Sequence, residues 1–190
     1  MLAPHILKMK INDVLPADIN VMDLVKTQPK FHARHHAISR AYIYQICRRR
    51  TAFGKRYVWW VKDQLNVRAM QQACSVFEGF HDFRSFTQDD PEEKSTTVEL
   101  QECSLHEFGP MVIIRIRGSH FLWRMVRQMV GMIVETGRGT IDPASLRELL
   151  YKPSTFPATK TAPPSGLYLQ HVQYDPKEKV PDVQPTIWIP

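Results

Sequence analysis

Residues 118–139, GSHFLWRMVRQMVGMIVETGRG, constrain the fold more than any other part of the sequence. Apolar residues recur here at three- and four-residue spacing, a pattern typical of a helix with a wide apolar face. The stretch is too short and too charged to span a bilayer, so we expect a helix buried in a core and no membrane partner. A narrow polar stripe follows the same helix at helical spacing. It consists of Arg124, Arg127, Gln128, Gly131 and Glu135. A solvated face is the commoner outcome for such a stripe, but its narrowness here favours an arginine that lines a cleft.

Positive charge is concentrated in one part of the chain. The 190 residues carry a formal net charge of +6 and are 43% hydrophobic, enough to bury a core. Between residues 30 and 56 there are eight positive side chains and no Asp or Glu. Such runs of charge usually lie on a solvated surface. Here strand-like residues alternate with the charged ones, so the charges should lie on one face. The block therefore indicates a surface that binds a polyanion.

The cysteines indicate a reducing compartment. Cys47, Cys74 and Cys103 are odd in number, far apart and set in apolar or strand-like sequence. We predict reduced core thiols in a cytoplasmic protein. The sequence shows no signal peptide, with its charged start, apolar run and small-residue cleavage site.

Residues 37–47, AISRAYIYQIC, are predicted to form a strand because they are rich in β-branched and aromatic residues. Alternation places Arg40, Tyr42 and Tyr44 on one face and small residues on the other. We expect the small face to pack under helices. The tyrosine face would suit a nucleotide, since a ring can stack on a base while a guanidinium binds a phosphate. For Tyr44 we favour an ordinary half-buried strand position.

The remaining pattern predicts the fold class. We expect strands at 57–62 and 167–172, helices after Asn66 and Asp142, and a hairpin of 96–105 with 111–117 that shows Arg115 and Arg117 on one side. This order predicts an α+β fold with an antiparallel or mixed sheet, helices on one face and a basic, aromatic-bearing cleft on the other. We expect one domain over residues 1–175 and a proline-rich extended tail over 176–190.

Three kinds of site are not indicated by the sequence. His32, His35, His36 and Cys47 do not have the spacing of a closed zinc site. No glycine-rich loop opens a helix, and no serine or cysteine lies in a nucleophile elbow. We therefore predict neither a metal nor a cofactor.

Four segments together resemble one enzyme family. They are FHARHHAISRAYIY at 31–44, EGFHDFRSF at 78–86, GSHFLWRMVRQMVG at 118–131 and TAPPSGLYL at 161–169. In this order they resemble motifs of the TruA family of tRNA pseudouridine synthases. Four motifs in the right order are far more specific than any one alone.

The resemblance implies an isomerase that converts uridine to pseudouridine in the tRNA anticodon arm (the 38–40 type) without a cofactor. In the family the uridine is flipped into a cleft and an aspartate attacks it or assists departure of the base. Tyr42 is similar to the family tyrosine that packs on the target base. Arg127 is similar to the arginine that pairs with the catalytic carboxylate and holds it ionised. Residues around Leu167 resemble the pocket wall.

The sequence departs from the family at the nucleophile. The family motif Arg-Thr-Asp-x-Gly-Val-His-Ala is absent, since the only Arg-Thr here, Arg50-Thr51, is followed by Ala52. The resemblance is thus to the C-terminal half alone, and we assign no catalytic aspartate. One hypothesis is a tRNA pseudouridine synthase domain, inactive in isolation, whose partners are tRNA, a second copy of the chain and the missing N-terminal half. The other is a non-catalytic RNA-binding or dimerisation module. Predicted RNA-binding residues are Arg34, Arg40, Arg48, Arg49, Arg50, Arg115, Arg117 and Arg124.

Overall fold

The computed structural model describes residues 2–90 and 92–189. The chain divides into two units, Met1–His36 and Ala37–Pro190. This boundary differs from the one at residue 175 that composition suggested. Residues 176–189 form no helix or strand, but they pack on the sheet of the second unit. Residues 17–38, which contain the boundary between the units, also form no helix or strand.

The described residues of the first unit form one helix, α1 (Pro4–Val14), with a proline in its first turn. Asn12 fixes the following segment to this helix, because its side chain accepts from the Val21 amide at 2.7 Å and donates to the Val21 carbonyl at 3.0 Å. No residue of α1 is buried. The described part of this unit therefore does not enclose a core of its own.

The second unit is built on a six-stranded mixed sheet, which confirms the α+β prediction. Its path runs β2-β1-β5-β4-β3, and β6 also pairs with β1. The β1–β2 pair is parallel, and the remaining pairs are antiparallel. The strands are β1 (Ser39–Cys47), β2 (Trp59–Trp60), β3 (Gly79–Asp82), β4 (Thr97–Phe108), β5 (Met111–Gly118) and β6 (Leu167–Gln173).

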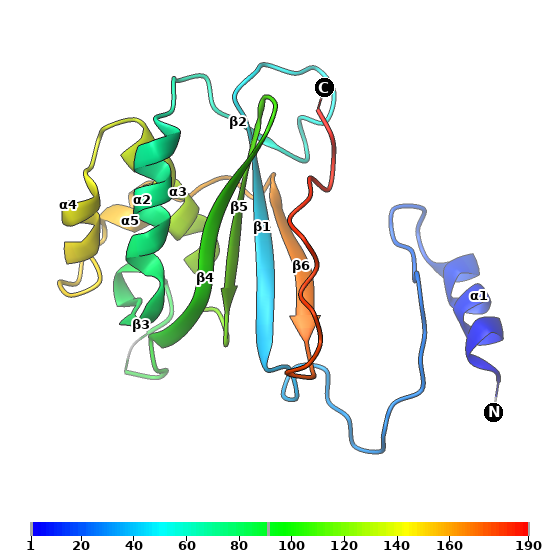
Figure 1. The fold of residues 1–190 in the computed structure, drawn as a ribbon. Helices are drawn as coiled ribbons and strands as arrows, with labels where there is room; N and C mark the ends of the chain where they lie inside the picture. Colours follow the sequence, from blue (N-terminus) through cyan, green and yellow to red (C-terminus); the bar gives the residue numbers. More distant parts are fainter. Residues whose placement is uncertain (1, 91, 190) are drawn as a thin grey trace. The chain divides into compact units, whose positions relative to one another are not determined.

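The helices of the second unit gather on one side of this sheet, as Figure 1 shows. They are α2 (Val67–Phe77), α3 (Met125–Gly137), α4 (Pro143–Glu148) and α5 (Phe156–Thr159), with a 3-10 turn at Arg84–Phe86. Asn66 caps α2 by accepting from the Ala69 amide at 3.1 Å, and Asp142 caps α4. None of the helices in the described ranges has the length and apolar character needed to cross a bilayer.

Two local predictions needed correction. The central helix begins at Met125 rather than near residue 118, because β5 continues to Gly118 and Arg124 adopts a left-handed φ of 62° just before the helix. Residues 79–82, which are absent from the strands expected from sequence, form the edge strand β3. Their pairing with residues 97–100 of β4 depends on a chain-distant partner that local sequence does not reveal.

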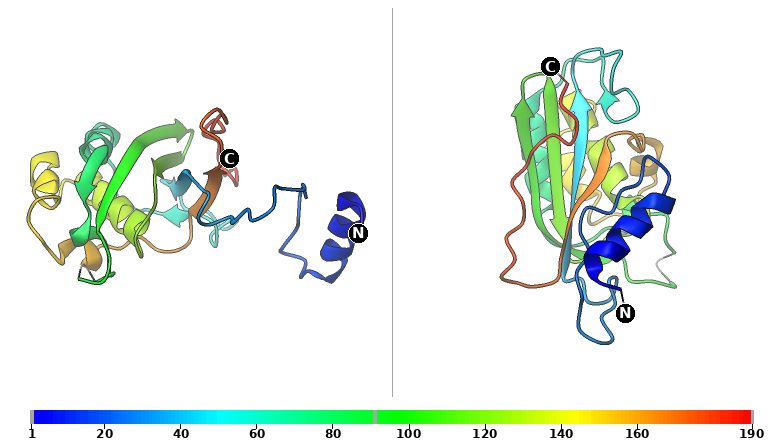
Figure 2. Two further views of the ribbon diagram at one scale, coloured as in Figure 1. Left: turned by 90° about the horizontal axis from the view of Figure 1, so that it is seen from below. Right: turned by 90° about the vertical axis from the view of Figure 1, so that its right-hand side faces the viewer.

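The prediction about the two faces of β1 was wrong. Tyr44 and Ile46 are buried in the main core with α2 and α3, so the tyrosine face is the one covered by helices. Ile43 and Cys47 lie on the opposite face, in a smaller core closed by Val183 of the C-terminal segment. Figure 2 shows that segment passing over the sheet face away from the helices. The C-terminal segment, and not the helices, therefore covers the face of β1 that carries Ile43 and Cys47.

Candidate active site

The polar stripe of α3 binds one segment of chain, residues 160–163. Arg127 donates from Nε to the Ala162 carbonyl at 2.7 Å, and its own carbonyl accepts from the Ala162 amide at 3.0 Å. At Gly131, one turn further on, a Cβ atom would overlap the Lys160 carbonyl. Glu135 lies within 3.5 Å of the Lys160 ammonium. Three positions four residues apart therefore fix this segment on the helix.

The guanidinium of Arg127 keeps most of its hydrogen-bonding capacity. Only its Nε is used by the Ala162 carbonyl, and Nη1 and Nη2 bond to no residue within 2–90 or 92–189. Within these two ranges, no carboxylate lies close enough to the Arg127 guanidinium to form an ion pair. The two Nη groups can bind a carboxylate in a bidentate manner.

Tyr44 supports this arrangement from the sheet. It is fully buried and donates from its hydroxyl to the Pro163 carbonyl at 2.7 Å. Burial raises the pKa of Tyr44 far above its ordinary value, and the charge of Arg127 offsets only part of this rise. Tyr44 therefore stays a hydroxyl that holds the 160–163 segment. Its role is structural, as predicted, but it is fully buried and not half-buried.

Tyr42 occupies a different environment on the same strand. It is half-buried, and its ring meets Phe121 edge to face at a centroid distance of 5.0 Å. The β1–β6 register shifts between Ala41 and Tyr42, which marks a bulge. Bulges re-aim side chains and are frequent beside active sites. Tyr42 lies opposite Leu169 of β6, and the predicted pocket residue Leu167 lies opposite Tyr44.

The turn before β6 connects these residues to the 160–163 segment. Gly166 has φ of +100°, and a Cβ there would lie 2.6 Å from the Gln45 carbonyl oxygen. Only glycine fits this close approach. The Pro163–Pro164 pair and Gly166 are sequence signals for this turn, but local sequence does not reveal its contact with α3.

The predicted RNA-binding arginines fall into separate groups. Arg115 and Arg117 lie on the outer sheet face and share Glu102, with Arg115 Nη2 at 2.8 Å from its carboxylate. Arg48 pairs with Glu107 at 2.7 Å. These three charges are therefore partly neutralised. Arg49, Arg50 and Arg124 are exposed, Arg40 donates to the Ser119 carbonyl, and Arg34 belongs to the first unit.

The histidines considered for a metal are engaged locally. The His32 amide donates to His36 Nδ1 at 2.8 Å, and buried Cys47 donates to the Arg49 carbonyl. Throughout the residues that the structure describes, no group of three or more His, Cys, Asp or Glu side chains is placed to hold a metal ion.

Comparison with known proteins matches these elements to one family. A family model described as tRNA pseudouridine synthase matches residues 73–175, which run from α2 to just beyond β6. The chain belongs to the tRNA pseudouridine synthase family. It is similar to tRNA pseudouridine synthase A of Moorella thermoacetica, with 37% identity over 166 residues that cover 86% of this chain and 68% of that protein.

Other relatives of the tRNA pseudouridine synthase family give the same coverage. The tRNA pseudouridine synthase A of Aquifex aeolicus is 37% identical over 164 residues, which cover 85% of this chain and 67% of that protein. The enzyme of the same name from an Exiguobacterium species is 37% identical over 165 residues, covering 87% and 67%. The chain thus matches about two thirds of each relative, and the family is one of isomerases.

The contact of α3 with the 160–163 segment can be tested through Glu135. Burial alone would raise the pKa of Glu135, but hydrogen bonds from Arg138 and Thr140 and the charges of Arg138 and Lys160 bring it below the ordinary value. We expect Glu135→Gln to lower the free energy of unfolding by about 2 kcal/mol at pH 7, since two cations lose a shared carboxylate.

The pH dependence of this effect follows from the direction of the shift. A carboxyl with a lowered folded pKa stabilises the fold above its unfolded pKa, and the contribution is lost as pH falls through the folded pKa. The difference between wild type and Glu135→Gln in urea unfolding should therefore be full at pH 7 and shrink once pH falls below the ordinary value of 4.5. The control is Glu148→Gln, which removes an exposed pair with Lys152. Equal effects at the two positions would contradict the assignment.

Proposed function

We propose that this chain is the part of a tRNA pseudouridine synthase that holds the target uridine of the anticodon arm and orients the catalytic carboxylate. The observation that supports this most is the Arg127 guanidinium, which is fixed through Nε and has both Nη groups open to a carboxylate. An arginine in this position lowers the pKa of the carboxyl that it binds and keeps it ionised as a nucleophile.

Tyr42 is assigned to the base of the flipped uridine. Its ring is half-buried, has Phe121 at its edge, and lies on the strand next to Leu169. A partly exposed ring braced by a second ring is suited to pack against an extruded base. In this assignment Leu167 belongs to the same wall, and the reaction needs no cofactor.

The aspartate is proposed to come from an N-terminal segment that is not in the 190 residues. The family motif is absent from the sequence, and the relatives extend beyond the matched region by about a third of their length. In this proposal the chain alone binds tRNA without converting uridine. A second copy of the chain and a cytoplasmic location belong to the same proposal, the latter because Cys47, Cys74 and Cys103 are free and buried.

The absent motif favours one other function, a non-catalytic RNA-binding module derived from this family. The net charge of +6 would supply affinity for tRNA without chemistry. The two functions differ in whether an aspartate-bearing segment restores turnover.

The test measures pseudouridine formation and tRNA binding in one sample, with unmodified tRNA transcript and the 190-residue chain. We expect binding without product, and product once the aspartate-bearing N-terminal third of a relative is fused to the chain. Product from the chain alone would show that another carboxylate serves and would contradict the assigned site. Binding with no product from the fusion would favour the non-catalytic module.

A further inference from the structure

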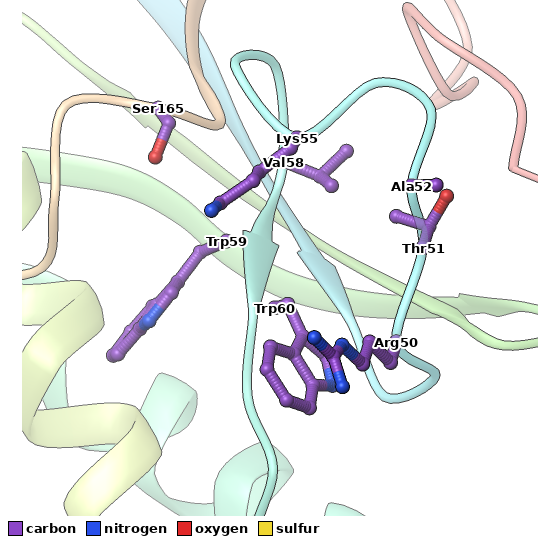
Figure 3. Close-up of a pocket in the computed structure, with 8 residues that line it drawn as sticks. All are labelled: Arg50, Thr51, Ala52, Lys55, Val58, Trp59, Trp60 and Ser165. Carbon is purple, nitrogen blue, oxygen red and sulfur yellow. The ribbon is translucent and has the colours of Figure 1, made fainter.

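A pocket of about 710 Å³ lies beside β2. Among the described residues, its lining includes neither Tyr42 nor Arg127. The loop after β1 forms one wall, β2 the next, and the turn before β6 contributes Ser165, as Figure 3 shows. We call it the Trp60 pocket. The residues that matter for its chemistry are Arg50, Thr51, Lys55, Trp59, Trp60 and Ser165. Its volume lies within the range usual for ligand sites.

The two adjacent tryptophans have different roles. Trp59 is half-buried and packs into the core, with its ring 6.1 Å from that of Tyr44 and below the guanidinium of Arg138. Trp60 points to the opposite side of the strand and is 38% exposed. Arg50 lies over the Trp60 ring, with Cζ 5.7 Å from its centroid. The pocket thus presents an indole with a guanidinium at cation–π distance, and every nucleobase has a flat face that can stack on an indole.

The charge of the Trp60 pocket is positive. Arg50 and Lys55 are both exposed, and neither forms an ion pair with a carboxylate in the described ranges. Among the residues that the structure describes, no acidic side chain lines the pocket. The loop that carries these cations is shaped locally, because Thr51 Oγ1 bonds to the Phe53 carbonyl at 2.7 Å and Gly54 has φ of +70°. Two cations beside an exposed aromatic ring form the combination that binds a nucleotide phosphate together with its base.

The pocket is linked to the candidate active site through Trp59, which lines the pocket and whose ring lies 6.1 Å from that of Tyr44. Gly166 follows Ser165 and packs against the backbone of Gln45 and Trp59, with its Cβ position 3.2 Å from the Trp59 amide nitrogen. Four residues before Gly166 is Ala162, the partner of Arg127. A strand of RNA held at one site is therefore kept close to the other.

We propose that the Trp60 pocket binds one nucleotide of the tRNA other than the target uridine, with its base stacked on Trp60 and its phosphate at Lys55. The inference rests on the proposed function only in taking tRNA as the partner. It assigns Trp60 and Lys55 to affinity and not to the chemical step.

The experiment measures the affinity of the 190-residue chain for fluorescently labelled, unmodified tRNA over a range of salt concentrations. We expect Trp60→Leu to weaken binding about tenfold, the effect of losing one base–aromatic stack. Trp60→Phe should restore most of the affinity. Lys55→Gln should weaken binding and reduce the slope of log affinity against log salt by about one, because one phosphate contact is lost.

Two variants serve as matched controls. Trp188→Leu removes another tryptophan that is 59% exposed, and Lys152→Gln removes one positive charge near α4. Equal affinities of Trp60→Leu and Trp188→Leu, with unchanged thermal unfolding, would overturn the proposal. So would an equal loss of binding to poly-glutamate and tRNA, which would assign the pocket to acidic protein chains.

The outcomes also separate this inference from the proposed function. A loss of tRNA affinity in Trp60→Leu supports the pocket even if the fusion enzyme forms no pseudouridine. Product formation by the fusion enzyme, together with a tRNA affinity that Trp60→Leu does not change, would support the proposed function. It would overturn the role proposed for the Trp60 pocket.

Discussion

Arg127→Ala is expected to reduce pseudouridine formation more than about 100-fold in an enzyme completed by an aspartate-bearing N-terminal segment. The variant loses the Nη groups that would hold the carboxylate ionised. Affinity for tRNA should change little, since Arg127 is half-buried and is one charge among 25 lysines and arginines. Single-turnover rates at saturating enzyme, with affinity measured separately, distinguish the two effects.

Arg127→Lys sharpens this test because it keeps the positive charge. Lysine lacks both the Nε–H group that bonds to Ala162 and the planar fork that binds a carboxylate. We expect it to remain nearly as inactive as Arg127→Ala. Near-normal turnover of Arg127→Ala would contradict the role assigned to this arginine.

Gly131→Ala is expected to lower the free energy of unfolding by about 3 kcal/mol or more, at the upper end of the effects of overpacking. The added methyl group would overlap the Lys160 carbonyl, and backbone cannot move aside as a flexible side chain can. The intrinsic preference of a helix for alanine over glycine, about 1 kcal/mol, acts in the opposite direction. Urea unfolding followed by circular dichroism measures the net effect.

Gly109→Ala is the matched control for Gly131→Ala. Gly109 lies in the β4–β5 turn with φ of +57°, and no atom of the described residues lies within 4 Å of its Cβ position. Its substitution brings only the strain of a left-handed backbone, about 1–2 kcal/mol. If Gly131→Ala were as stable as wild type, the 160–163 segment could not be packed on α3 as described.

Some parts of this structure could be predicted from sequence and others could not. The cap at Asn66, the β4–β5 hairpin and the apolar face of α3 are local patterns, and the structure confirms them. Alternation along β1 correctly separated Tyr42 and Tyr44 from their neighbours, but it could not say which face the helices cover. That choice depends on the C-terminal segment, where Val183 and Ile189 bury against the outer face. Apolar residues spaced among the prolines there were the available signal.

The candidate site shows the same division. The stripe of Arg127, Gly131 and Glu135 was predicted from helical spacing, whereas its partner at residues 160–163 was not. Nothing in local sequence links a glycine in a helix to a carbonyl 29 residues later. The Trp60 pocket was missed because its lining comes from two distant segments, residues 50–60 and Ser165.

The pairing of β1 with β6 has a consequence for how the chain is made. β1 spans Ser39–Cys47, and its neighbour β6 spans Leu167–Gln173, so more than a hundred residues separate the two strands. Closing so long a loop is slow, and synthesis delivers the N-terminal strand first. On the ribosome, the edge of β1 that pairs with β6 stays unpaired along Ser39–Tyr44 until nearly all of these 190 residues have emerged. Until then this strand edge can pair with other chains, so we expect a chaperone to protect it.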